Sequence, residues 1–142
     1  MNTQPPEHSL SSTENPWREH TLPGLMGCLG PMLTRREPQG WAYGLKLRAD
    51  HLNQAGVAHG GTLTTLLDQA LSAIAWQHAG KQPCVTVQLN TSFLHAARLH
   101  QELIARGCVT HTTGSLIFMT GTLHADDQLI ATAQAIMKRL KA

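Results

Sequence analysis

The sequence of 142 residues is poor in charge and in aromatic side chains. Charged residues make up 14% of it, well below the usual share of about 25%. Hydrophobic residues make up 42%, so a chain of this length can still bury a full core. With so few charges, part of the surface is neither charged nor core. We therefore expect an oligomer, in which subunits cover this surface.

Cysteines are few, and no long apolar run is present. Cys28, Cys84 and Cys108 are odd in number and far apart, which argues against a disulfide framework and for a reducing compartment. Residues 1–20 are polar and lack the apolar stretch of a secretory signal. No segment approaches the roughly eighteen apolar residues of a membrane span. These absences predict a cytoplasmic protein with no membrane partner.

Basic residues barely outnumber acidic ones, giving a net charge of +2. They are scattered, apart from a short cluster at Lys138, Arg139 and Lys141. Nucleic-acid-binding proteins usually present a basic stripe and a higher pI, so we expect no nucleic-acid partner. The small positive excess suits a small anionic substrate.

The chain divides into a tail and one domain. Residues 1–20 are polar and aperiodic, which predicts a flexible tail, and we expect residues 21–142 to form a single domain. The segment "TLPGLMGCLG" predicts a short helical turn that leads into a strand. "GWAYGLKLRA" alternates between apolar and other residues and predicts a half-buried strand.

The strongest helix signal runs from Gly60 to Ala79. One apolar stripe has a period near 3.6 residues and consists of Leu63, Leu66, Leu67, Ala70, Leu71 and Ile74. Thr62 is suited to the helix N-terminus, and Gly80 ends the helix.

After Gly80 the pattern changes to period two. The segments "CVTVQLN", "LIARGCVTH" and "SLIFMTGTL" predict strands, and the last two are joined by a hairpin across "TTG". The final segment, "QLIATAQAIMKRL", fits a helical stripe better than strand alternation. One long helix beside antiparallel strands indicates an α+β fold.

Asp68 is the single charged residue between Gly60 and Ala79. It shares a helix face with the small residues Thr64, Ser72, Ala75 and Ala79, and this face has no Lys or Glu such as a solvated face normally carries. We interpret the face as a contact with a second subunit. The alternative is a structural or plainly exposed carboxylate, which is the common role of an aspartate in a helix.

Two glycines precede this helix. Gly60 and Gly61 stand where backbone N–H groups lack internal partners and the helix dipole is positive, so an oxygen gaining negative charge is stabilised there. Asn53 adds a neutral donor and acceptor nearby. Asp68 lies roughly 10–12 Å further along the axis. An antiparallel neighbouring subunit would bring its Asp68 carboxylate to this N-terminus. The alternative interpretation of the two glycines is that they form an ordinary helix-entry turn.

The spacing N-x-x-G-x-x-HGG-x-x-x-x-L-x-D runs from Asn53 to Asp68. It resembles the hotdog-fold acyl-CoA thioesterases, in particular the phenylacetic-acid-degradation type of the 4-hydroxybenzoyl-CoA thioesterase superfamily. The resemblance runs from about Pro23 to Leu140. It implies an α+β hotdog fold, in which a curved antiparallel sheet wraps a long helix and the last segment is a strand instead of a helix. It also implies homodimers that pair into tetramers, with active sites between subunits.

The resemblance further implies an activity and a set of site residues. An acyl-CoA substrate is hydrolysed, and no separate cofactor is needed, because CoA is part of the substrate. Asp68 acts as general base or nucleophile, and the Gly60 N–H polarises the thioester carbonyl. Asn53 helps to hold the water or the carbonyl, His59 orients the site, and Thr86 assists near the attacking water.

One part of the resemblance is incomplete. Relatives often carry a basic residue in the turn that corresponds to residues 112–115, near the CoA phosphates, and here this turn has none. The CoA-binding residues are therefore unassigned. The candidate substitutes are Arg98, Arg106, Lys138 and Arg139.

Other chemistries find little support. The nine histidines form neither an HExxH motif nor a helical i, i+4 pair, so we expect no metal site. A serine nucleophile lacks its GxSxG elbow. We expect Cys84 and Cys108 to be core thiols, and Trp41, Tyr43 and Phe93 to line the core or an acyl pocket.

Two rival functions remain at this point. A non-catalytic acyl-CoA-binding or lipid-binding hotdog module would not need an interfacial carboxylate. A hotdog dehydratase would present an Asp and His pair in a different motif. The sequence favours acyl-CoA hydrolysis over both.

Overall fold

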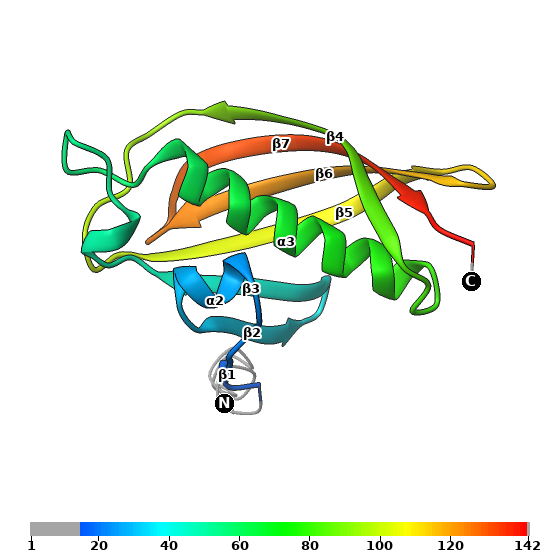
Figure 1. The fold of residues 1–142 in the computed structure, drawn as a ribbon, viewed down its shortest axis with the longest axis horizontal. Coiled ribbons are helices and arrows are strands. Elements are labelled where there is room, and N and C mark those ends of the chain that lie inside the picture. Colours follow the sequence, from blue (N-terminus) through cyan, green and yellow to red (C-terminus); the bar gives the residue numbers. More distant parts are fainter. Residues whose placement is uncertain (1–14, 142) are drawn as a thin grey trace, which may run out of the picture.

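The structure is a computed structural model and describes residues 15–141. One long helix lies against a single antiparallel sheet of seven strands that curves around it, so the fold is α+β (Figure 1). The elements in chain order are β1 (Arg18–His20), α2 (Leu25–Leu29), β2 (Met32–Glu37), β3 (Gly40–Lys46), the 3₁₀ helix η1 (Ala49–His51), α3 (Gly60–His78), β4 (Cys84–Phe93), β5 (Glu102–Thr112), β6 (Leu116–Ala125) and β7 (Gln128–Arg139). The strand order in the sheet is β1-β2-β3-β5-β6-β7-β4.

Helix α3 packs on the sheet through the apolar stripe that the sequence predicts. Leu63, Leu66, Leu67, Ala70 and Leu71 are buried against the strands. Beneath the helix, β5 and β6 carry glycines whose backbones approach Leu71 so closely that a Cβ there would touch its side chain. The helix therefore sits deep in the curve of the sheet.

The helix begins one residue after a histidine. The ring Nδ1 of His59 accepts the Gly61 N–H at 2.8 Å, so His59 is the N-cap. Thr62 lies in the first turn, near the helix N-terminus as predicted, but it is not the N-cap, since its hydroxyl donates to the His51 carbonyl at 3.0 Å. The helix ends at His78, just before the predicted stop at Gly80.

The C-terminal segment is strand β7, paired with β6 on one side and β4 on the other. The helix favoured by its residue pattern is therefore wrong, and the strand implied by the resemblance is confirmed. Its inward residues Ala131, Ala133, Ala135 and Met137 are buried in the core that α3 covers. The predicted hairpin is also confirmed, since residues 113–115 join β5 to β6.

At the N-terminal end, the sheet takes in residues that the sequence places in the tail. Arg18, Glu19 and His20 pair with β2, whereas residues 1–14 of the predicted tail lie outside the described residues. The short helix α2 leads into β2, and β3 is the predicted alternating strand. Within residues 15–141, no helix is long and apolar enough to cross a membrane.

Strand β4 forms one edge of the sheet and runs back alongside α3 (Figure 1), with Thr86 near Asp68 and Phe93 near Gly60. It pairs with β7 along one side, and an irregularity in register lies between Thr86 and Gln88. Large apolar side chains are exposed on and just beyond this strand, namely Val85, Val87, Phe93 and Leu94. Burying these side chains would require a second molecule against this edge.

Candidate functional site

Asp68 lies in the middle of α3, on the side that faces β4. The Thr86 hydroxyl of β4 donates to its Oδ1 at 2.6 Å. The Ser72 hydroxyl, one turn along the helix, is 3.5 Å from the Thr86 oxygen. Because the single Thr86 proton is given to Asp68, Ser72 is the donor in that second contact. The carboxylate is half-buried and held in one orientation.

No Lys, Arg or His within residues 15–141 forms an ion pair with Asp68. Its second carboxylate oxygen also has no recorded donor in that range. An ionised carboxylate can accept several hydrogen bonds, so this oxygen remains able to accept a proton from water. The arrangement suits a general base or nucleophile.

The start of α3 presents a backbone donor. The Gly61 N–H is bound by the His59 ring, whereas the Gly60 N–H, one residue earlier, has no acceptor among the residues described. The ring of Phe93 from β4 lies beside Gly60, and a Cβ at that position would be 3.3 Å from its Cζ. A free amide at the positive end of a long helix thus lies next to an apolar ring.

Asn53 lies in the loop before α3. Its Oδ1 accepts the N–H groups of Ala55 at 2.9 Å and Val57 at 3.3 Å. Because the loop occupies this oxygen, the side-chain NH₂ is the group that remains able to donate. Asn53 and His59 line the same open pocket.

The predicted site residues therefore form two groups within one chain. Asn53, His59 and Gly60 lie at the start of α3, and Asp68 and Thr86 lie further along it. Eight residues separate Gly60 from Asp68, which is about 12 Å along the helix axis. One chain does not bring the carboxylate to the Gly60 amide.

The candidate phosphate-binding cations differ in their surroundings. Arg106 is bound to Glu37 through two hydrogen bonds, of 2.7 and 2.9 Å, and is not free for a ligand. This pairing lowers the pKa of Glu37 and raises that of Arg106. Arg139 donates to the carbonyls of Thr113 and Gly114, so β7 places a cation at the turn whose own sequence has none. Lys138 and Lys141 line the open pocket beside that turn.

Three further expectations can be compared with the structure. The described residues contain no group of three or more side chains suited to a metal ion. Cys84 is half-buried, and burial raises its pKa. Cys108 is exposed, because it points to the sheet face opposite α3, so the prediction of a core thiol is wrong there. Tyr43 is buried in the core, whereas Phe93 is 54% exposed.

The model of the thioesterase superfamily matches residues 55–132, which include Gly60, Asp68 and Thr86. The chain belongs to the thioesterase superfamily. A similar protein is PA0474 of Pseudomonas aeruginosa, provisionally named an esterase. It is 33% identical over 114 residues, which cover 79% of this chain and 85% of that protein.

Solved structures place this thioesterase superfamily chain in the hotdog fold. A mutant form of the phenylacetic acid degradation protein PaaI of Thermus thermophilus superposes with a TM-score of 0.73 at 22% identity, covering 81% of this chain and 97% of that one. The BH2602 protein of Bacillus halodurans, solved with CoA, gives 0.71 at 21% identity, covering 77% and 74%. The predicted fold is confirmed.

Two residues of this region escaped the sequence analysis. In the sequence Ser72 is only one of several small residues on a helix face, although it contacts Thr86 in the structure. His51 is one of nine histidines, and no spacing in the sequence marks it. The structure shows it buried just before the loop that leads to α3.

Proposed function

We propose that this protein hydrolyses an acyl-CoA thioester to a free carboxylic acid and CoA, at a site shared between two subunits. The observation that carries the proposal is Asp68, a half-buried carboxylate without an ion pair in the described chain and oriented by Thr86. The same helix begins with the Gly60 N–H, which has no acceptor among residues 15–141. Membership of the thioesterase superfamily supports thioester hydrolysis.

Asp68 acts on water. It takes one proton as the water oxygen attacks the thioester carbonyl carbon, and the carbonyl oxygen gains negative charge. The Gly60 N–H and the positive end of α3 stabilise this oxygen. The intermediate then collapses, the carbon–sulfur bond breaks, and the leaving CoA thiolate takes up the proton held by Asp68, which regenerates the carboxylate. In a variant of this route the Asp68 carboxylate attacks first and water then hydrolyses the resulting anhydride.

The site requires a homodimer, because Asp68 and the Gly60 amide of one chain are separated by about 12 Å along the helix. In the dimer, the Asp68 of one subunit faces the Gly60 of its partner. The exposed apolar residues of edge strand β4 support this assembly. The β4 edge of a second subunit would cover them and would pair with the free backbone N–H and C=O groups of this strand. Two such dimers then pair as a tetramer.

The CoA portion of the substrate carries phosphates. The BH2602 protein, which shares this fold, was solved with CoA. Lys138, Arg139 and Lys141 line an open pocket beside the β5–β6 turn and supply positive charge that can attract phosphate. The chain therefore offers candidate groups both for the thioester carbonyl and for the phosphates of the proposed substrate.

Release of free thiol from a panel of aryl, short, medium and long acyl-CoAs tests the proposal. We expect turnover with at least one of them, and an Asp68→Asn variant should lose it while keeping the oligomer by size-exclusion chromatography. An Asn variant with near-normal kcat would refute the role of Asp68. Binding of acyl-CoA without thiol release would instead support the alternative, a non-catalytic binding module.

A further inference from the structure

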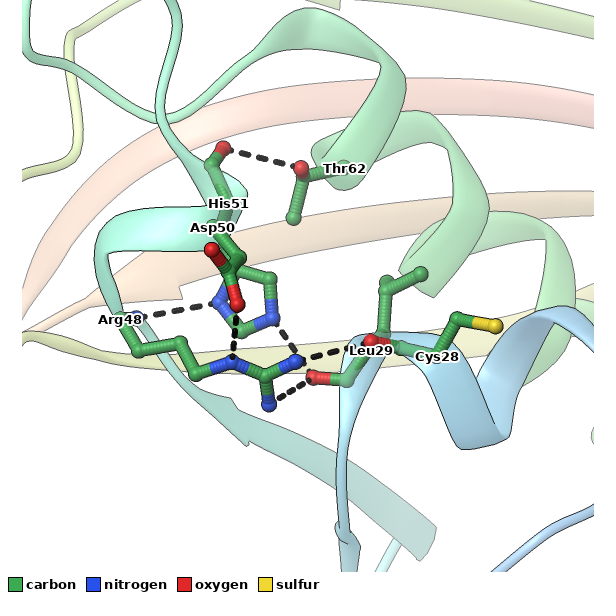
Figure 2. Close-up of polar contacts among 6 residues, drawn as sticks. All are labelled: Cys28, Leu29, Arg48, Asp50, His51 and Thr62. Atoms are coloured by element: carbon green, nitrogen blue, oxygen red, sulfur yellow. Dashed lines mark hydrogen bonds and ion pairs between the residues drawn. The ribbon is translucent and has the colours of Figure 1, made fainter.

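His51 is buried, with 2% of its surface exposed, and the mechanism above does not use it. Both of its ring nitrogens are bound. The Arg48 backbone N–H donates to Nδ1 at 3.1 Å, and Nε2 lies 2.6 Å from the Leu29 carbonyl (Figure 2). An N–H needs an acceptor and a carbonyl needs a donor, so Nδ1 is bare and Nε2 carries the proton. This fixes one neutral tautomer.

The backbone carbonyl of His51 is bound to the start of α3. It accepts the His59 N–H at 2.8 Å. It also accepts the Thr62 hydroxyl at 3.0 Å (Figure 2). His59 immediately precedes Gly60, and Thr62 follows it by two residues. One carbonyl therefore holds the chain on both sides of the Gly60 amide.

The other side of His51 is anchored to α2. The Arg48 guanidinium donates to the carbonyls of Leu29 and Cys28, both at 2.8 Å, and lies 3.5 Å from the Asp50 carboxylate (Figure 2). Arg48 and the His51 ring thus bind the same end of α2. Through His51, that end is linked to the first turn of α3.

We propose that His51 is a positioning residue that holds the Gly60 N–H in the direction the thioester carbonyl requires. This inference rests on the proposed function. Donors to a developing oxyanion are effective only when they are fixed in place beforehand, and an error of about 0.5 Å already weakens such a site. His51 supplies this rigidity without contacting the substrate.

The link can be cut from either end with matched variants. From the helix side, Thr62→Val removes the hydroxyl at nearly constant shape, and Thr62→Ser keeps it. From the ring side, His51→Asn retains an acceptor near the Arg48 N–H but cannot reach the Leu29 carbonyl. His51→Gln places its NH₂ near the position of Nε2 and is the partial rescue.

Steady-state kinetics on these variants, measured well below each melting temperature, tests the role. We expect Thr62→Val and His51→Asn to lower kcat by about tenfold, the effect of a modest loss of transition-state stabilisation. KM should change little, and Thr62→Ser and His51→Gln should recover most of kcat. The double variant His51→Asn/Thr62→Val should lose no more kcat than the worse single variant, because both substitutions break the same link between α2 and α3. A normal kcat in folded Thr62→Val and His51→Asn would overturn the inference.

A readout independent of turnover separates this inference from the proposed function. In ¹⁵N relaxation, the Gly60 N–H order parameter should fall from about 0.85 towards 0.6 in His51→Asn, while core strand amides stay rigid. An unchanged order parameter would overturn the positioning role. If the wild-type protein releases no thiol from any acyl-CoA, the proposed function fails, whereas this measurement still decides the role of His51.

Discussion

The hydroxyl of Thr86 in edge strand β4 donates a hydrogen bond of 2.6 Å to the carboxylate of Asp68 in the middle of α3. A residue of the strand that would meet a second subunit thus orients the carboxylate to which we assign the chemistry. The site and the proposed subunit interface are therefore adjacent.

Replacing Thr86 tests this orientation. Thr86→Val keeps the shape but removes the donor, and a hydrogen bond to a charged group contributes about 1.5–3 kcal/mol. We expect kcat for thioester hydrolysis to fall by about tenfold or more. Thr86→Ser, which keeps the hydroxyl, should remain near wild type. Equal activity of the Val and Ser variants would show that the hydroxyl plays no part.

Gly60→Pro removes the proposed oxyanion donor, and the first helical position is where proline is best tolerated. His59 already has the extended backbone that a residue before proline adopts. Gly60→Ala is the matched control, because it keeps the N–H and adds a Cβ in the same place beside Phe93. We expect the Pro variant to lose about 10²–10³ in kcat relative to the Ala variant. A Pro variant as active as the Ala variant would exclude this amide as the oxyanion donor.

The apolar edge of β4 provides a test of assembly. Val87 is 57% exposed there, and Val87→Asp would place a charge in the proposed interface. Light scattering should show a shift towards monomer, accompanied by loss of hydrolysis. Leu25→Asp is the control, since Leu25 is 64% exposed in α2, away from β4. This variant should keep both the oligomer and hydrolysis. A Val87→Asp protein that stays dimeric would place the interface elsewhere.

The Glu37–Arg106 pair makes stability depend on pH. The hydrogen bonds from Arg106 have the largest effect and lower the pKa of Glu37 below its ordinary 4.5. Burial opposes them, and the hydrogen bond from Arg35 adds to the lowering. The stabilisation by this pair is therefore complete above the pKa that Glu37 has in the unfolded protein. It is lost as the pH falls through the lower pKa that Glu37 has in the folded protein. Glu37→Gln should lower the free energy of unfolding by about 1 kcal/mol at pH 7.

The cost of Glu37→Gln should shrink below pH 4.5 in urea titrations, because protonation of the wild-type carboxyl removes the same charge. Glu102→Gln is the control, since Glu102 is exposed and in none of the ion pairs recorded for residues 15–141. A pH-independent cost of Glu37→Gln would mean that the effect is one of packing and not of charge.

The sequence predicts α3 well because its leucine stripe reflects the one surface that the helix buries. It mispredicts β7 because alanine has high helix propensity, whereas the fold needs small residues on that strand beneath α3. Ala131, Ala133 and Ala135 alternate inwards, but Ile136, on the opposite face, completes a false helical stripe. Tertiary packing overrides propensity here.

The residues of the site also differ in how far the sequence reveals them. Asp68 stands out in the sequence because it is a lone charge in a neutral helix. The hydrogen bond from Thr86 depends on how β4 runs beside α3, which no local pattern encodes. His51 is likewise invisible, because its importance comes from long-range contacts with Leu29 and Thr62.

The most direct test of a shared site is complementation between two inactive variants, Asp68→Asn and Gly60→Pro. If Asp68 of one subunit works with Gly60 of its partner, each mixed dimer contains one intact site and one doubly damaged site. After subunit exchange at equal concentrations, about a quarter of wild-type thiol release should return, as expected for a symmetric dimer. If each site lies within a single chain, no mixed dimer contains an intact site. Formation of mixed dimers without recovered hydrolysis would contradict the account.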